Sequence, residues 1–188
     1  LLRRAGLGLL MALIAGCVGG ETSQTTHFFV LTPLPMDHPS LSQSDRSSTK
    51  DLAIELEPVE IPEYLNRQQI VTRLNGNALH LAQYHHWGGG LKDNLTSVLA
   101  DNLSTLLDSS RISVLPGRGL ANPDYRVALE LTRFEMDVSG LVSLAARWRV
   151  FKSDQEEPVI MRLTRLSQRA DSTDDYGAVV EAMSETFG

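Results

Sequence analysis

The chain has 188 residues, enough for one domain with a sizeable hydrophobic core. It is 42% hydrophobic and 21% charged, a composition typical of globular proteins and unlike that of fibrous or collagen-like chains. The formal net charge is −6 and the sequence contains no basic stripe, which argues against a nucleic-acid partner. The single cysteine, Cys17, excludes an internal disulfide and a cysteine-based zinc cluster.

The first sixteen residues have the pattern of a secretory signal peptide. Arg3 and Arg4 form a positive beginning, and twelve uncharged residues follow from Ala5 to Gly16. As a helix this run would extend for about 18 Å, at roughly 1.5 Å per residue. A bilayer core is about 30 Å thick, so the run is short for a membrane span. An ordinary signal peptide and an uncleaved anchor are the alternatives.

The signal peptide ends in Ile14-Ala15-Gly16-Cys17, which resembles a bacterial lipobox. This resemblance implies cleavage between Gly16 and Cys17, a diacylglyceryl group on the Cys17 sulfur, and an acyl chain such as palmitate on the new amino terminus. No other cofactor is expected. Val18 stands where an Asp usually retains a lipoprotein in the inner membrane, which favours the periplasmic face of the outer membrane. A buried, unmodified Cys17 is the alternative.

Residues 17–26 read as the lipidated cysteine and a flexible polar tether, and residues 27–188 as a single periplasmic domain. Within this domain, residues 27–32 predict a strand, and residues 37–50 predict a mobile loop rich in Ser, Asp and Pro. The alternation of Leu52, Ile54 and Leu56 predicts a second strand. Asn75-Gly76-Asn77 separates two apolar runs, 69–74 and 78–82, and predicts a hairpin.

The second half of the chain predicts two helices and several strands. Leucine and valine recur at helical spacing from Leu91 to Leu107, after Gly88-Gly89-Gly90. A short strand over 112–115 and three long strands follow. The alternation shifts by one residue near Thr132-Arg133, which predicts a β-bulge, and shifts again before Leu166. Asp174 or Asp175 is a candidate cap for a final helix.

Together these elements predict an α/β (α+β) fold, in which two amphipathic helices pack on a mixed or antiparallel sheet in one domain. The tetrads VTRL, LTRF and LTRL recur at Val71, Leu131 and Leu163. They mark either a duplication or the ordinary composition of strands, and their spacing is not that of a solenoid.

No catalytic motif is found in the sequence: the G-x-S-x-G elbow, the H-E-x-x-H zinc motif and the P-loop are missing. His85 and His86 are neighbours on an extended segment, so their side chains point to opposite faces and are poorly placed to share a metal ion. The acidic residues from Glu55 to Glu63 are expected on a solvated face. We therefore expect neither an enzyme nor a metal site.

Several segments of the mature chain resemble the PqiC-like ABC-type transport auxiliary lipoproteins. The most specific segment is IPEYLNRQQIV, residues 61–71; weaker ones are residues 28–31, His85-His86-Trp87 before the helix, and the strand from Tyr125 through Phe134-Glu135. In place of the family's Trp-x-Glu-Pro/Asp-Leu transition, this chain has Trp87-Gly88-Gly89-Gly90-Leu91. With the lipobox, the resemblance covers most of the mature chain.

The resemblance implies an auxiliary lipoprotein of an MCE-type lipid transport system in a Gram-negative envelope. Such a protein docks the transport channel, built by a periplasmic MCE-domain protein, at the outer membrane, forms a homo-oligomeric ring and supports membrane integrity. An outer-membrane assembly lipoprotein that partners a β-barrel is the alternative function.

Candidate partner contacts are Tyr64, Arg67, Gln68 and Trp87, because aromatic and arginine side chains are enriched at interface cores. The alternative for these residues is a structural role, in which Tyr64 and Leu65 fill the core, Arg67 pairs locally and Trp87 also packs in the core.

Overall fold

The structure is a computed structural model that describes residues 24–36, 38, 52–117 and 119–188. The predicted signal peptide, Cys17, most of the tether and nearly all of the 37–50 loop lie outside the described residues. The elements in chain order are β1 (His27–Phe29), β2 (Ile54–Leu56), the 3-10 helix η1 (Glu63–Leu65), β3 (Gln69–Arg73), β4 (Leu79–Trp87), α3 (Leu91–Leu107), β5 (Ile112–Val114), β6 (Tyr125–Asp137), β7 (Leu141–Lys152), β8 (Ile160–Arg169) and α4 (Tyr176–Phe187).

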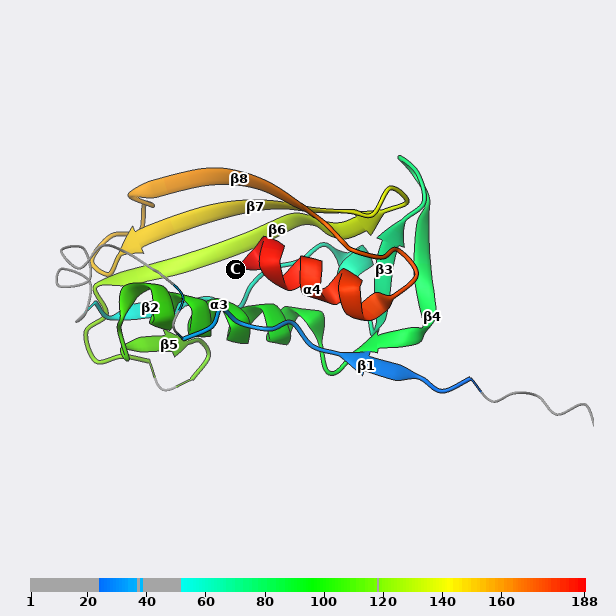
Figure 1. The fold of residues 1–188 in the computed structure, drawn as a ribbon. Coiled ribbons are helices and arrows are strands. Elements are labelled where there is room, and N and C mark those ends of the chain that lie inside the picture. Colours follow the sequence, from blue (N-terminus) through cyan, green and yellow to red (C-terminus); the bar gives the residue numbers. More distant parts are fainter. Residues whose placement is uncertain (1–23, 37, 39–51, 118) are drawn as a thin grey trace, which may run out of the picture.

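The eight-stranded sheet is organised around β6. On one side, β6 pairs with β7 in antiparallel register, and β7 pairs with β8. The other side of β6 is shared: β2 pairs in parallel with its beginning and β3 in parallel with its end. Between these two strands, Glu60 forms an isolated parallel bridge with Glu130. The sheet is therefore mixed, and with two helices in one domain it confirms the predicted fold class (Figure 1).

Two local predictions are confirmed in detail. β3 and β4 form an antiparallel hairpin, closed where the Leu74 N–H donates to the Ala78 carbonyl at 2.9 Å. β4 continues to Trp87, five residues beyond the predicted end, so His85 and His86 do lie on a strand. The register between β6 and β7 shifts between Leu131 and Arg133, at the predicted bulge. This bulge keeps the apolar side chains on both sides of it facing the core.

The register shift predicted before Leu166 is wrong. β8 pairs with β7 through ten consecutive residue pairs without a shift. As a result, Met161 and Leu163 lie on one face of the sheet and Leu166 lies on the other. All three side chains are exposed. A register shift is needed only in a strand with a buried face, because there it keeps the apolar side chains turned towards the core. β8 has no buried face, so the change in its apolar pattern requires no register shift.

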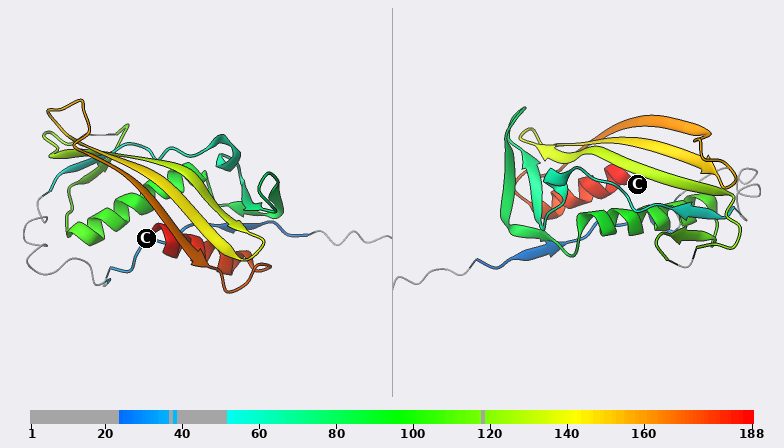
Figure 2. Two further views of the ribbon diagram at one scale, coloured as in Figure 1. Left: turned by 90° about the horizontal axis from the view of Figure 1, so that it is seen from above. Right: turned by 180° about the vertical axis from the view of Figure 1, so that it is seen from behind.

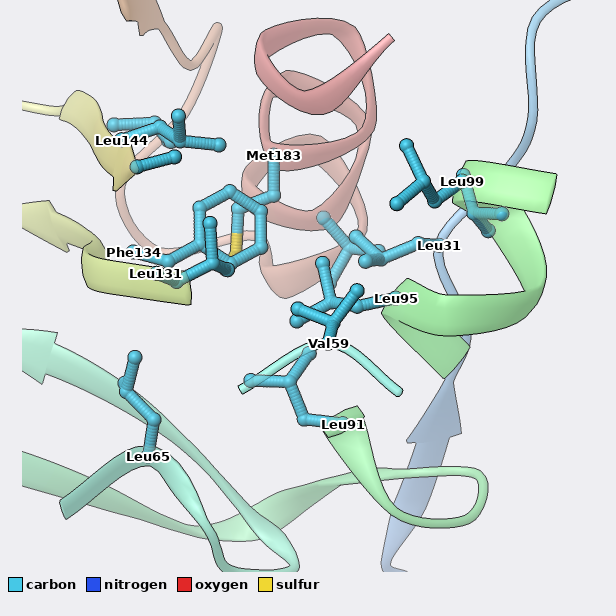
Figure 3. Packing of buried hydrophobic residues seen from close by; sticks show 14 of the residues in the cluster. Leu31, Val59, Leu65, Leu91, Leu95, Leu99, Leu131, Phe134, Leu144 and Met183 are labelled. Carbon is cyan, nitrogen blue, oxygen red and sulfur yellow. The ribbon is translucent and has the colours of Figure 1, made fainter. Parts of the chain in front are cut away.

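Both helices pack on one side of the long strands, which twist over them (Figure 2). The buried face of α3 carries Leu91, Leu95 and Leu99, and Met183 of α4 lies between these leucines and the strand residue Phe134 (Figure 3). Phe134 is completely buried and is the largest side chain at the centre of this cluster. The core therefore joins both helices to β6, the central strand of the sheet.

The segment after β1 is held against both helices by side-chain acceptors. The Leu31 N–H donates to Asn94 Oδ1 at 2.6 Å and the Leu34 N–H donates to Asn102 Oδ1 at 2.8 Å, both from α3. The Thr32 N–H donates to Ser184 Oγ of α4 at 3.0 Å. These bonds take the place of a sheet ladder, because Pro33 and Pro35 interrupt further strand pairing.

Replacing Asp175 by Ala is expected to lower the free energy of unfolding by about 1 kcal/mol. Its carboxylate caps α4 by accepting the Gly177 N–H at 2.8 Å, which satisfies a backbone donor that the helix cannot pair itself. Asp174→Ala is the matched control, since Asp175 and not its exposed neighbour is the capping residue. Urea unfolding of both variants measures the difference, and equal stabilities would argue against the cap.

Candidate partner interface

The candidate contact residues lie on and after η1, a short turn set by proline. Pro62 precedes the turn with φ −59°, and its carbonyl accepts the Leu65 N–H at 2.9 Å. The turn points its two large side chains in different directions. Leu65 is 2% exposed and belongs to the hydrophobic core, whereas Tyr64 is half-buried and reaches the β6 residue Glu135. The segment is therefore anchored in the core beside an accessible surface.

Glu135 is the centre of a buried polar cluster. Its side chain is fully buried, on the opposite side of β6 from its neighbours Phe134 and Met136 in the core. One carboxylate oxygen accepts the Tyr64 hydroxyl at 2.8 Å. The other accepts Arg73 Nε of β3 at 2.7 Å and forms an ion pair with Arg133 Nε at 3.0 Å. We call these four residues the Glu135 cluster.

The Glu135 cluster carries more positive than negative charge. Two guanidinium groups surround one carboxylate, and the Arg73 and Arg133 side chains keep 22% and 41% of their surface exposed. The hydrogen bond to Glu135 raises the pKa of Arg73 above its ordinary value, so this residue stays charged. The Arg73 guanidinium also lies 5.9 Å from the centre of the Tyr64 ring. The carboxylate thus orients an aromatic ring and two cations at the surface.

Burial and the hydrogen bond to Glu135 raise the pKa of Tyr64 to about 12, from an ordinary value of 10.0. A folded state that holds this proton more tightly loses stability as the pH rises from about 10 towards 12. We expect the free energy of unfolding to fall over this range, and Tyr64→Phe to lack this component of the fall. Urea unfolding of both proteins at pH 8 to 11.5 tests this prediction. Tyr176 is present in both proteins and contributes equally to their pH dependence. Parallel curves of unfolding free energy against pH would therefore contradict the prediction.

The remaining candidates divide between surface and core. Arg67 is exposed, and its Nε donates to the Tyr64 carbonyl at 2.8 Å. Gln68 is exposed, and its carbonyl accepts the Trp87 N–H at 2.7 Å. Trp87 itself is 3% exposed and packs in the core, as in the structural role that the sequence left open for it. The structure therefore brings Tyr64, Arg67 and Gln68 together at the surface, with Trp87 beneath them.

Sequence reasoning missed Arg73 and Arg133 as site residues, although a signal for them existed. Arg73 is the arginine of the tetrad VTRL, and Arg133 is the arginine of LTRF. Both bind Glu135, although Arg73 is paired with Asp137 and not with Arg133, so the two tetrads are not in register with each other. The arginine of the third tetrad, Arg165 on β8, lies across the sheet from Arg133, with Ala145 between them. It makes no contact with Glu135 among those described.

The outer face of the long strands continues this cationic surface. Arg147 pairs with Glu130 at 3.3 Å, and both side chains are partly exposed. Next to this pair is a hollow of about 400 Å³, and its lining includes Arg149, Met161 and Leu163. Arginine and methionine are residue types enriched at protein interfaces. The face from η1 to β8 therefore has the composition of a surface that binds protein.

His85, which was considered as a metal ligand, is engaged in ring stacking. Its ring lies 4.1 Å from that of Tyr176 and 5.8 Å from that of His27. Burial, followed by the charges of His27 and His86, lowers the pKa of His85. Within the described ranges, no group of three potential metal-ligating side chains is found.

Two observations concern the membrane. Gly16 and Cys17, the predicted cleavage and lipidation positions, fall in the part of the chain that the structure does not describe. Neither α3 nor α4, the two α-helices among the described residues, combines the length and apolar character needed to cross a bilayer.

Two solved structures share this fold. A crystal structure of an uncharacterized protein is 18% identical with a TM-score of 0.69, over 87% of this chain and 92% of that one. Protein XCC0632 from Xanthomonas campestris is 16% identical with a TM-score of 0.71, over 86% of this chain and 88% of its own. At these identities the likeness shows the fold alone. No curated protein sequence matches this chain.

The family is shown by the sequence itself. Residues 34–188 match the profile of the family described as the ABC-type transport auxiliary lipoprotein component. The matched region includes η1, the Glu135 cluster, both helices and every strand except β1. The chain therefore belongs to the ABC-type transport auxiliary lipoprotein family.

Proposed function

We propose that this protein is an outer-membrane lipoprotein that docks the periplasmic channel of an MCE-type lipid transport system. Lipid chains on Cys17 hold the domain at the periplasmic face of the outer membrane, and the folded domain binds the MCE-domain protein. The observation that carries this proposal is the family match over residues 34–188, which follows a lipobox in the same chain. The proposed location rests on position 18, where Val18 stands in place of the aspartate that usually retains a lipoprotein in the inner membrane.

The surface proposed to bind the channel protein is the one formed by Tyr64, Arg67 and Gln68 beside the Glu135 cluster. Its support is physical: the buried Leu65 anchors the backbone of η1, so the backbone that carries the exposed side chains is already ordered before binding. Tyrosine and arginine are also the residue types that most often carry the binding energy of an interface. In this proposal several identical copies form a ring, so that each contributes one such surface.

The experiment is a binding measurement with the soluble Cys17→Ala protein and a purified MCE-domain protein from the same envelope. We expect binding by the unmodified surface, and a loss of about tenfold or more in affinity for Arg67→Glu, since hot-spot side chains contribute about 2 kcal/mol or more. Lys152→Glu is the matched control, because Lys152 is an exposed cation at the end of β7, on a strand that does not carry the η1 surface.

Light scattering of the same soluble protein measures the size of the assembly. If Arg67→Glu leaves the affinity for the MCE-domain protein unchanged, the contact does not lie at η1. No binding to any MCE-domain protein, together with copurification of an outer-membrane β-barrel, would instead support the barrel-assembly alternative.

A further inference from the structure

β8 is a long strand with one free side. It pairs with β7 through ten residue pairs, and no strand of the described chain lies on its other side. Figure 1 shows it along the outer margin of the sheet. Proteins usually protect such an edge with a bulge, a proline, a very short strand or charged side chains. Over Ile160–Arg169, β8 has only the charged side chains, so its backbone edge is regular and open to a strand of complementary charge.

The direction of the backbone groups on this edge follows from the register. At the end of β8, the Ala170 N–H donates to the Gly140 carbonyl at 2.9 Å, and the pairing continues from there without a shift. In an antiparallel ladder, alternate residues direct both backbone groups to the same neighbour. The even-numbered residues of β8 therefore bond β7. Met161, Leu163 and Arg165 direct their N–H and C=O groups away from the sheet.

The side chains of β8 leave apolar surface exposed on both faces. Met161 and Leu163, on the face opposite the helices, are 74% and 48% exposed. Ile160 and Leu166, on the other face, are 53% and 50% exposed. An additional strand beside β8 would cover part of all four, since cross-strand neighbours on each face lie within contact distance.

The charge of β8 selects the kind of strand that it accepts. The ten residues contain three arginines and no acidic residue. Arg169 donates to the Ser139 carbonyl, whereas Arg162 and Arg165 are exposed and make no ion pair with any described residue. Opposite charges across neighbouring strands stabilise a sheet, and like charges destabilise it. The complementary strand therefore carries acidic side chains between apolar ones.

A second copy of this chain fits the edge poorly. Pairing of β8 with β8 of another copy would gather six arginines with no acidic residue on either strand. The other strands at the ends of the described sheet, β1 and β5, have three residues each and could cover less than half of the ten-residue edge. The observations thus favour a segment of a different protein.

We propose that β8 binds an extended segment of a partner protein, with acidic and apolar residues on both of its faces, which joins the sheet as an additional strand. Main-chain hydrogen bonds to Met161, Leu163 and Arg165 hold this segment, and Arg162 and Arg165 attract its carboxylates. This interaction is independent of the lipid anchor and of the η1 surface described above. It therefore stands or fails separately from the proposed docking function.

The test uses the soluble Cys17→Ala protein and two synthetic ten-residue peptides. One consists of valine, threonine and glutamate, with glutamate and valine on both faces of the extended peptide; in the other, lysine replaces glutamate. We expect the acidic peptide to bind, the lysine peptide to bind about tenfold more weakly or less, and added salt to weaken binding. In hydrogen exchange measured by NMR, the acidic peptide should protect the amides of Met161, Leu163 and Arg165.

Two variants separate the backbone from the charge. Arg165→Pro removes an outward N–H and should weaken binding of the acidic peptide well beyond Arg165→Ala, which keeps that N–H. The double variant Arg162→Glu/Arg165→Glu should prefer the lysine peptide, and it keeps the test valid if the proline variant does not fold. The proposal is overturned if the acidic peptide does not bind, if both peptides bind equally, or if the protected amides all lie outside β8. It is also overturned if β8 is protected by self-association alone.

Discussion

Glu135→Ala is expected to lower the free energy of unfolding by about 3–5 kcal/mol, since breaking a buried ion pair leaves its partners uncompensated. The Glu135 carboxylate is fully buried and serves the Tyr64 hydroxyl and the Arg73 and Arg133 guanidinium groups. It also accepts the Phe134 N–H at 3.2 Å. Because both arginine side chains keep partial access to water, we place the expected loss at the lower end of this range.

Glu130→Ala is the matched control for this prediction. Glu130 lies on the same strand and the same face, and it pairs with Arg147 at 3.3 Å, but both side chains are partly exposed. Exposed ion pairs contribute about 0–1 kcal/mol, so the control should be almost neutral. Urea unfolding of the two variants gives the comparison. Similar losses for both would mean that burial of the Glu135 cluster adds nothing to stability.

Glu135→Ala should also weaken the proposed docking, because the carboxylate orients Tyr64 and Arg73. Glu135→Gln separates the two effects, since it keeps the volume and an acceptor oxygen but removes the charge. We expect it to recover part of the stability. Binding of the MCE-domain protein, measured well below the unfolding midpoint of each variant, then reports the geometry of the surface rather than the fraction folded.

Cys17→Ala is expected to release the protein from the membrane almost completely. Each buried methylene contributes about 0.8 kcal/mol, and a single acyl chain anchors a protein only marginally, whereas several chains hold it for long times. The predicted cleavage removes Arg3 and Arg4, which would leave 15 basic and 23 acidic residues, a net charge of −8. Such a chain is not attracted to anionic lipid headgroups, so no second force replaces the lost lipids.

Membrane fractionation and incorporation of labelled palmitate measure this effect. The wild type should be labelled and sediment with the outer membrane, and Cys17→Ala should be unlabelled and released. Val18→Asp is the control: it keeps the lipids and should shift the protein to the inner membrane. A wild-type protein from native cells with a free thiol and an intact leader would refute both the anchor and the proposed location.

Local elements were predictable because their signals lie within a few residues. Each of three confirmed features follows from a pattern within one turn, one helix or one strand. They are the Asn75-Gly76-Asn77 turn, the leucine spacing of α3 and the bulge near Arg133. β8 shows the limit of this reasoning. Its shifted pattern resembled that of β6, but a shift has structural meaning only where one face is buried, and burial is a property of the assembled sheet.

The candidate site was predictable only in part, for the same reason. The segment around Tyr64 and Arg67 was identified from its sequence, whereas the Glu135 cluster joins residues that are 71 and 62 positions apart, Tyr64 with Glu135 and Arg73 with Glu135. Nothing near Glu135 in the sequence indicates a buried carboxylate. Its partners arrive from η1 and β3 only because β3 pairs in parallel with the end of β6.

By itself, the sequence determined the family, a motif that resembles a lipobox, the two helices and the positions of most strands along the chain, since composition, spacing and turn residues act over short distances. The tertiary structure alone decided that one side of β6 is shared by β2 and β3, that Glu135 is buried beside two arginines, and that β8 keeps an open edge. Those features depend on which distant segments pack together. Burial and pairing are set by the whole fold, and no short stretch of chain encodes them.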